Sequence, residues 1–150
     1  MSGRLRKFIA LDPDRRLTLL RAFLALRSAR RDLDHQPFRD IVGALQPAGN
    51  ARADAAPDAR DLKRAGDIGW AVRTASRHVP FDASCLVQVL AARTMLRKAG
   101  ITGTIYIGAG QNRDDSDEKF AAHAWLKCGG EFVTGEAGHE QYAVIGVVSW

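Results

Sequence analysis

The apolar residues of the N-terminal half recur every three or four positions, which is the period of an α-helix. Asp12-Pro13 is typical of a helix start, because an acidic N-cap precedes a proline at the first helical position. Leucines at positions 17, 20 and 24 then predict an amphipathic helix that runs to about residue 33. Pro37 ends this helix, and residues 38–45 are predicted to form a shorter one.

Two further helices are predicted in the middle of the chain. Residues 47–60 are aperiodic and rich in proline, alanine, glycine and aspartate, which indicates a loop. An apolar stripe then predicts a helix over about residues 67–79, ended by Pro80. The clearest helix spans residues 84–99, because Ser84 or Asp82 can cap its start and Gly100 follows its end.

After Gly100 the apolar residues alternate with polar ones, which predicts strands. Strands are expected around residues 105–107, 121–128, 131–135 and 142–148, with a polar loop at 111–119. Helices followed by an antiparallel sheet predict an α+β fold. We expect a single domain with a helical front segment (1–46), a loop (47–60) and a core (61–150) that holds the candidate chemistry.

Composition narrows the class of protein. The 150 residues are 46% hydrophobic and 26% charged, as in an ordinary globular domain. Two cysteines are too few for a disulfide framework, so we expect thiols in a reducing compartment. The N-terminus lacks a signal-peptide pattern and no apolar stretch is long enough to span a membrane, so a soluble cytoplasmic protein is predicted.

The net charge of +5 is concentrated at the front, where residues 1–40 carry ten Lys or Arg against five Asp. A basic chain can bind nucleic acid or an anionic surface. The interleaved aromatic residues of RNA-binding modules are missing, however. We therefore interpret the charge as a solvated helix face and expect no nucleic-acid partner.

Cys85 is the candidate nucleophile, because it falls in the first turn of the helix predicted over residues 84–99. The peptide dipoles and free N–H groups at a helix N-terminus favour a thiolate there. The same N–H groups can hold the oxyanion of a tetrahedral intermediate. The alternative is a small buried thiol, which is the commoner role of a single cysteine.

His123 is the candidate general base, and Glu136 is the candidate for a carboxylate that orients it. A two-residue turn at Gly129-Gly130 gives a register in which His123 faces Glu136 on the next strand. Directly opposed side chains are close enough for a carboxylate to hold an imidazole, which completes a Cys–His–acid triad. A one-residue bulge would turn Glu136 away and leave Thr134 or a backbone carbonyl as the orienting group.

Other candidate sites are weaker. Cys128 lies on the strand face away from His123 and is expected to be structural. Without a CxxC or HxxxH pattern, we expect no metal and no cofactor. Gly108-Ala109-Gly110 is too little for a phosphate-binding loop, because no helix start follows it.

Taken together, these residues are similar to those of the lasso peptide biosynthesis B2 proteins. The resemblance rests on residues 84–88 (Ser-Cys-Leu-Val-Gln), 96–101 (Leu-Arg-Lys-Ala-Gly-Ile), 105–108 and 122–126 (Ala-His-Ala-Trp-Leu). Members of that family are transglutaminase-like cysteine proteases that remove the leader from a lasso peptide precursor. The resemblance implies a transglutaminase/papain-like fold, in which a nucleophile at a helix N-terminus packs on a small antiparallel sheet.

The resemblance also implies roles and partners. Cys85 would attack the peptide bond at the leader–core junction, and His123 would activate the thiol and then protonate the leaving amine. A separate leader-recognition protein would deliver the precursor peptide, and a separate ATP-dependent lasso cyclase would close the ring on the freed core. Family members often carry an aspartate shortly after the histidine strand, where this chain has Thr134-Gly135-Glu136.

Two alternatives to leader hydrolysis stay open. An acyltransferase or transglutaminase-type enzyme would use the same Cys–His pair with an amine as the acceptor in place of water. A non-catalytic module would use the basic front helix to bind a partner. In the leading hypothesis, that helix helps to dock the leader-recognition protein or the precursor through Arg15, Arg27, Arg30 and Arg31.

Overall fold

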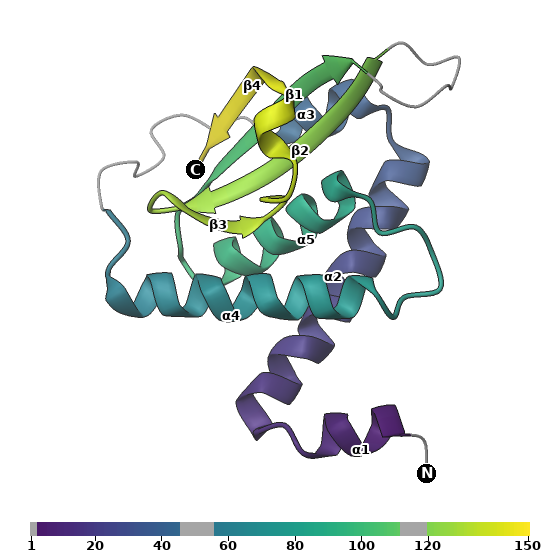
Figure 1. Cartoon of the computed structure of the whole chain (residues 1–150), viewed down its shortest axis with the longest axis vertical. Helices are drawn as coiled ribbons and strands as arrows, with labels where there is room; N and C mark the ends of the chain where they lie inside the picture. Colours follow the sequence, from purple (N-terminus) through teal and green to yellow (C-terminus); the bar gives the residue numbers. More distant parts are fainter. Residues whose placement is uncertain (1–2, 46–55, 112–119) are drawn as a thin grey trace.

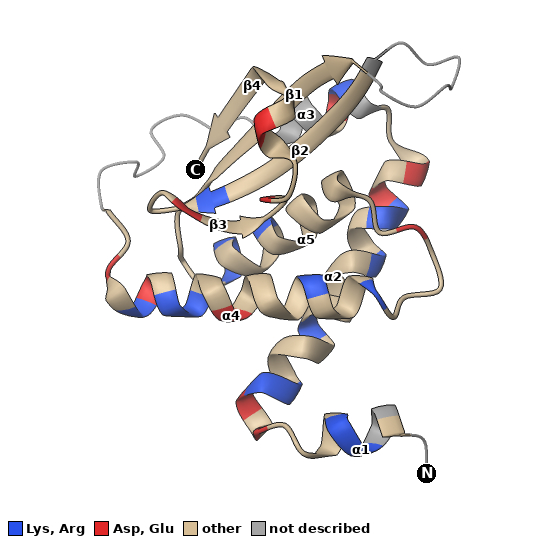
Figure 2. Cartoon of the chain, in the orientation of Figure 1, with Lys and Arg blue, Asp and Glu red and all other residues tan. Residues whose placement is uncertain are grey.

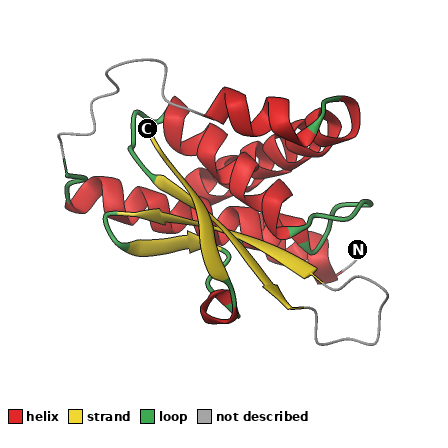
Figure 3. Cartoon of the chain, turned by 90° about the horizontal axis from the view of Figure 1, so that it is seen from above, coloured by secondary structure: helices red, strands yellow, loops and turns green. Residues whose placement is uncertain are grey.

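The fold has two layers, with helices packed against one face of a four-stranded antiparallel sheet (Figure 3). The computed structural model describes residues 3–45, 56–111 and 120–150. The predicted α+β arrangement is confirmed. Along the chain (Figure 1) the elements are α1 (Gly3–Ile9), α2 (Pro13–His35), α3 (Phe38–Leu45), α4 (Ala59–Ser76), α5 (Cys85–Lys98), β1 (Thr104–Gln111), β2 (Phe120–Cys128), β3 (Glu131–Thr134), the 3-10 turn η1 (His139–Gln141) and β4 (Ala143–Ser149).

Helix α2 begins where the sequence predicts. Asp12 is its N-cap and accepts a hydrogen bond from the backbone N–H of Arg15 at 3.0 Å, with Pro13 as the first helical residue. The residues that α2 buries recur at helical spacing and are Leu19, Ala22, Leu26 and Ala29. The predicted stripe of leucines at positions 17, 20 and 24 lies on the exposed face instead. The buried residues join α2 to α4 and α5, so the front segment and the C-terminal core share one hydrophobic interior.

Helix α4 is longer than predicted, because the expected start near residue 67 is wrong. It begins at Ala59 and ends at Ser76. Asp58 and Asp61 form a reciprocal capping box, in which the Asp58 carboxylate accepts from the Asp61 N–H at 2.9 Å. Asp58 falls within the loop predicted over residues 47–60, although here it caps a helix. Helix α1 was also not predicted.

The sheet order is β3-β2-β1-β4, and every neighbouring pair is antiparallel. The predicted turn between β2 and β3 is confirmed, because Gly129 and Gly130 both have positive φ (57° and 87°). The polar loop predicted at 111–119 and the loop predicted at 47–60 lie mostly outside the described residues.

The register between β2 and β3 departs from the prediction after two pairs. Cys128 faces Glu131 and Lys127 faces Phe132, as expected. An uninterrupted ladder would next set Leu126 opposite Val133, but Leu126 faces Thr134 instead. Val133 is therefore the extra residue of a β-bulge, and both it and Thr134 are buried (2% and 1% exposed). The bulge lets two consecutive side chains point into the core.

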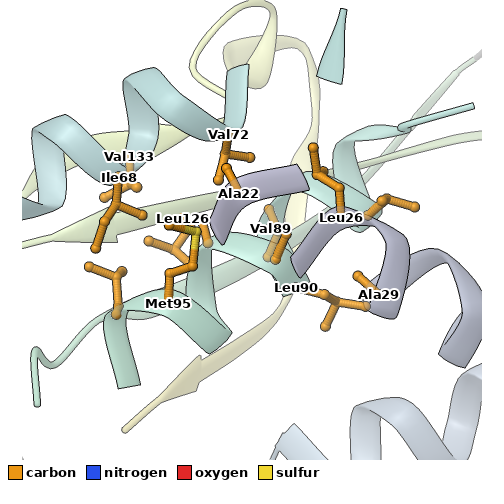
Figure 4. Close-up of a cluster of buried hydrophobic side chains, with 14 of the residues drawn as sticks. Ala22, Leu26, Ala29, Ile68, Val72, Val89, Leu90, Met95, Leu126 and Val133 are labelled. Atoms are coloured by element: carbon orange, nitrogen blue, oxygen red, sulfur yellow. The ribbon is translucent and has the colours of Figure 1, made fainter. Parts of the chain in front are cut away.

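The core lies between the helices and the sheet face that carries Ile105, Ala124, Leu126, Cys128 and Val148. Side chains from α2, α4, α5, β2 and β3 interdigitate there, as Figure 4 shows for Ala22, Leu26, Ala29, Ile68, Val72, Val89, Leu90, Met95, Leu126 and Val133. Within the described residues, no helix has the length and apolar character needed to cross a membrane. The core packs α5 against β2, and these two elements carry the candidate nucleophile and base.

Candidate active site

Cys85 is the first residue of α5. Ser84 is the N-cap, and its hydroxyl lies 3.5 Å from the backbone N of Val87. Because the first backbone N–H groups of a helix have no partner within the helix, they face outward beside the Cys85 side chain. The half-buried thiol thus lies at the positive end of the α5 dipole, where a thiolate or an oxyanion is stabilised.

Gln88 lies one turn further along α5 and was missed in the sequence. Its side-chain amide donates a hydrogen bond to the carbonyl oxygen of Ala83 at 2.9 Å. This bond fixes the segment that leads into the helix, and therefore the position of Cys85. The spacing of three residues from the nucleophile was a usable signal, because residues i and i+3 share one helix face.

His123 lies on β2, on the face away from the core. Its Nε2 is 2.8 Å from the carbonyl oxygen of Gly135. A carbonyl oxygen can only accept a hydrogen bond, so Nε2 carries the proton and Nδ1 of the neutral ring is left as an acceptor. This tautomer suits a general base, because the lone pair of Nδ1 can accept a proton.

The hydrogen bond to His123 depends on glycine at position 135. Gly135 has φ of 77°, which side chains rarely allow. A Cβ there would lie 2.8 Å from Cα of Trp125 and would also overlap the carbonyl oxygen of Ala124. Only glycine therefore lets the chain after β3 approach β2 closely enough to hold the imidazole.

Cys85, His123 and Glu136 all line one pocket of about 440 Å³. The pocket lies at the start of α5, beside the end of β3. Its lining consists of Arg73, Cys85, Gln88, His123, Phe132, Val133, Thr134, Gly135, Glu136 and Ala137. The structure thus brings the predicted nucleophile and the predicted base to one cavity, which the sequence alone placed 38 positions apart in the chain.

The predicted pairing of His123 with Glu136 does not occur in the ladder. Strand β3 ends at Thr134, and the bulge at Val133 shifts the register before His123 is reached. The group that holds Nε2 is instead a backbone carbonyl, as a bulge was expected to require. Glu136 is exposed and lines the pocket, so its role as the orienting carboxylate stays a prediction.

Thr134 was the other alternative for orienting the imidazole. Its side chain is almost fully buried, and its hydroxyl has no hydrogen-bond partner within the described parts of the chain. An unpaired buried hydroxyl lowers the free energy of unfolding by about 1 to 3 kcal/mol. The Thr134 hydroxyl lies beside the pocket and is therefore a candidate for a role in the reaction.

Arg73 is a second pocket residue that the sequence did not reveal. Its Nη1 donates to the carbonyl oxygen of Val133, the residue that the bulge takes out of the ladder. Gly69, one turn earlier on α4, leaves room for this contact, since a Cβ there would lie 2.9 Å from Nη1 of Arg73. Arg73 thus ties α4 to β3 and adds a positive charge to the pocket. No sequence pattern marks it.

Cys128 lies in a different environment from Cys85. It is 1% exposed in the core, and burial raises the pKa of its thiol, with Asp61 and Glu131 adding to the effect. Both cysteines are free thiols. Across residues 3–45, 56–111 and 120–150, no three metal-ligating side chains are grouped to hold an ion.

Comparison with known proteins gives one match. The sequence model of the transglutaminase-like superfamily matches residues 23–147, from within α2 to within β4, and this range includes Cys85 and His123. No curated protein and no solved structure matches the chain significantly. A match to this superfamily is consistent with cysteine peptidase or acyltransferase chemistry.

Proposed function

The chain belongs to the transglutaminase-like superfamily, and we propose that it is a cysteine peptidase that removes the leader from a lasso peptide precursor. Support for the peptidase chemistry comes from the pocket, and support for the substrate comes from the sequence resemblance around Cys85 and His123. The observation that carries the proposal is that Cys85 at a helix N-terminus and His123 with its Nε2 bound to Gly135 line the same cavity.

The arrangement suits a two-step acyl transfer. Nδ1 of His123 takes the proton of the Cys85 thiol, and the thiolate attacks the carbonyl carbon of the scissile peptide bond. The oxyanion that forms is stabilised by N–H groups at the start of α5. The imidazolium then protonates the leaving amine, and water releases the leader from the thioester.

The same thioester would serve an acyltransferase, so the acceptor decides between the two activities. Hydrolysis leaves a free carboxylate at the cleaved end, whereas an amine acceptor leaves an amide. We propose hydrolysis because of the resemblance to leader peptidases.

A partner protein would dock on the helical layer. Among the described Lys and Arg residues, only Lys127 lies in the sheet, and Figure 2 shows the others gathered on the helices and their ends. Of the four arginines proposed for docking, Arg15 lies over the ring of Trp70 (5.0 Å) and Arg30 pairs with Asp34 (3.0 Å). Arg27 and Arg31 are exposed one turn apart and form no ion pair within the described residues.

Arg27 and Arg31 are therefore the residues of α2 through which we propose that the leader-recognition protein binds. Changing both to Glu should weaken its binding by about tenfold at low ionic strength and less at high salt. Titration of the labelled partner at two salt concentrations measures this. Equal affinities of variant and wild type would exclude these two arginines from the interface.

The proposed function is tested by replacing the nucleophile. Cys85→Ala should reduce cleavage of the cognate precursor, presented with its leader-recognition protein, by about 10³-fold or more, because no other thiol lines the pocket. Mass spectrometry of the products gives the rate, the cleavage position and the chemistry at the new end. A thermal melt shows whether the variant is folded.

Cys128→Ala is the matched control, since it removes the other thiol from the core and leaves the pocket unchanged. It should cleave at nearly the wild-type rate. Cleavage by Cys85→Ala at the wild-type rate would exclude the peptidase proposal, and an amide adduct in place of a free carboxylate would assign the chain to the acyltransferases.

A further inference from the structure

Two aromatic rings on the outer face of the sheet stack with the imidazole of His123. The ring of Trp125 stacks on it with centroids 5.8 Å apart and planes 28° apart. The ring of Tyr142 stacks on it at 5.1 Å and 30°. A third ring, Tyr106, stacks on Trp125 at 5.7 Å and 7°. The imidazole thus contacts two flat rings that are both tilted by no more than about 30° from its plane.

The place of Tyr142 is made by two glycines of β1. Gly108 is the residue directly opposite His123 in the sheet, so its missing side chain leaves a gap beside the imidazole. A Cβ on Gly108 would lie 2.7 Å from Cβ of Tyr142, and one on Gly110 would lie 3.1 Å from Cδ1 of the same ring. The Gly108-Ala109-Gly110 stretch, which is too short for a phosphate loop, therefore leaves room for the Tyr142 side chain.

The segment between β3 and β4 places Tyr142 in this gap. The backbone N–H of Tyr142 donates to the carbonyl of His139 at 3.1 Å, at the end of η1. The His139 ring packs against Trp125 and Phe132, with centroid distances of 5.6 and 4.6 Å. Its Nδ1 donates to the carbonyl oxygen of Glu136 at 2.7 Å. The segment that supplies the Gly135 carbonyl to Nε2 thus continues into the residue that stacks on the same imidazole.

We propose that Tyr142, seated over Gly108 and Gly110, is a positioning residue that holds the His123 imidazole against Trp125 with Nε2 on the Gly135 carbonyl. The stack restricts rotation of the ring about its bond to the chain, so the imidazole keeps the orientation in which its Nε2 meets the Gly135 carbonyl. A flat ring is needed for this, whereas the tyrosine hydroxyl is not. The inference rests on the proposed function, because it assigns Tyr142 a role through the proposed base.

The test compares three substitutions of Tyr142 with one of Tyr106. Tyr142→Phe keeps the flat ring, Tyr142→Leu keeps apolar bulk without it, and Tyr142→Ala removes both. Tyr106→Leu is the matched control, because Tyr106 stacks on Trp125 without stacking on His123. The first readout is the alkylation rate of Cys85 by iodoacetamide at neutral pH, which depends on proton transfer to His123 and needs no substrate. The second is kcat and KM for precursor cleavage.

We expect Tyr142→Leu and Tyr142→Ala to alkylate about tenfold more slowly and to lose about 10- to 100-fold in kcat, with KM little changed. Tyr142→Phe and Tyr106→Leu should remain close to wild type in both. Wild-type alkylation and kcat in Tyr142→Leu would overturn the positioning role, and so would an equal loss in Tyr106→Leu. If a thermal melt shows that Tyr142→Ala is unfolded, the comparison of Tyr142→Leu with Tyr142→Phe still tests the positioning role.

These outcomes are separable from those of the proposed function. If Cys85→Ala is inactive and Tyr142→Leu is fully active, the positioning role fails and the peptidase stands. If Cys85→Ala cleaves normally, the peptidase fails, and slow alkylation in Tyr142→Leu would still show that the tyrosine controls the reactivity of the Cys85 thiol.

Discussion

The two cysteines of this chain occupy regions that differ in solvent exposure and in the groups that surround the thiol. Cys85 lies at the start of α5, half-exposed, beside a pocket that also contains His123. Cys128 lies at the end of β2, next to the Gly129-Gly130 turn, and is 1% exposed in the core. The same thiol group is thus placed once at the open end of a helix and once inside a regular hairpin.

This difference places the two thiols in contrasting electrostatic environments. At the start of α5, unpaired N–H groups and the helix dipole favour negative charge. At Cys128, burial disfavours the charged form and raises the pKa of the thiol. The predictions that follow test how far the two regions differ, from the largest expected effect to the smallest.

The largest expected effect is in alkylation by iodoacetamide. Cys85 should react about 100-fold faster than Cys128 near neutral pH, because only Cys85 is accessible and shares its pocket with a candidate base. Peptide mapping by mass spectrometry at timed intervals gives the two rates in one experiment. Because the pKa of Cys128 is raised, its alkylation should stay slow until the pH is well above the range in which an exposed cysteine ionises.

Unfolding in guanidinium chloride is the control for alkylation. It removes both environments, so the two thiols should then react at similar rates. Equal slow rates in the native protein would remove the contrast and favour a non-catalytic binding module.

A second contrast concerns the two ends of the β2–β3 hairpin. Near Cys128 the ladder is regular, and both glycines of the turn have the positive φ that it requires. Toward His123 the bulge at Val133 turns Thr134 into the core, where its hydroxyl has no partner within the described residues. The irregular end is therefore the one that lines the pocket.

Thr134→Val tests whether this irregular end is structural or functional. Valine has nearly the same shape without the hydroxyl, so the free energy of unfolding should rise by about 1 kcal/mol if the hydroxyl is merely unpaired. Denaturant unfolding measures the stability, and precursor cleavage measures the activity. A stable variant with wild-type activity would exclude Thr134 as the group that orients the imidazole.

The opposite pattern would have a different meaning. Higher stability combined with an activity loss of about tenfold or more would show that the Thr134 hydroxyl takes part in the reaction. Thr134→Ser, which keeps the hydroxyl, should then retain activity.

Much of the fold follows from local signals that the sequence carries. Asp12-Pro13 and Ser84 start helices because their side chains cap them, and Gly129-Gly130 makes the turn because both positions need positive φ. Cys85 was found in the same way, through its place after the Ser84 cap. The start of α4 was missed, since aspartates 58 and 61 are equally compatible with a loop until their reciprocal cap is seen.

The bulge could not be predicted from local signals, because its causes are distant in sequence. The carbonyl of Val133 is bound by Arg73, 60 residues earlier, and room for this contact depends on Gly69. The bulge in turn decides that Gly135, and no residue paired in the ladder, meets Nε2 of His123. Register beyond a hairpin turn depends on such tertiary contacts, so the partner of His123 is visible only in the structure.

The smallest effect is expected for Glu136→Gln. This variant tests whether activity requires a carboxylate at the irregular end of the hairpin. Because the Gly135 carbonyl already holds Nε2 of His123 at 2.8 Å, loss of the charge on an exposed side chain should lower kcat/KM by at most about threefold. Cleavage kinetics measure this, with Glu140→Gln, an exposed carboxylate that does not line the pocket, as the matched control. A fall of about 100-fold or more in Glu136→Gln alone would instead identify Glu136 as the acid of a triad, in which the carboxylate replaces the carbonyl as the partner of the imidazole when substrate is bound.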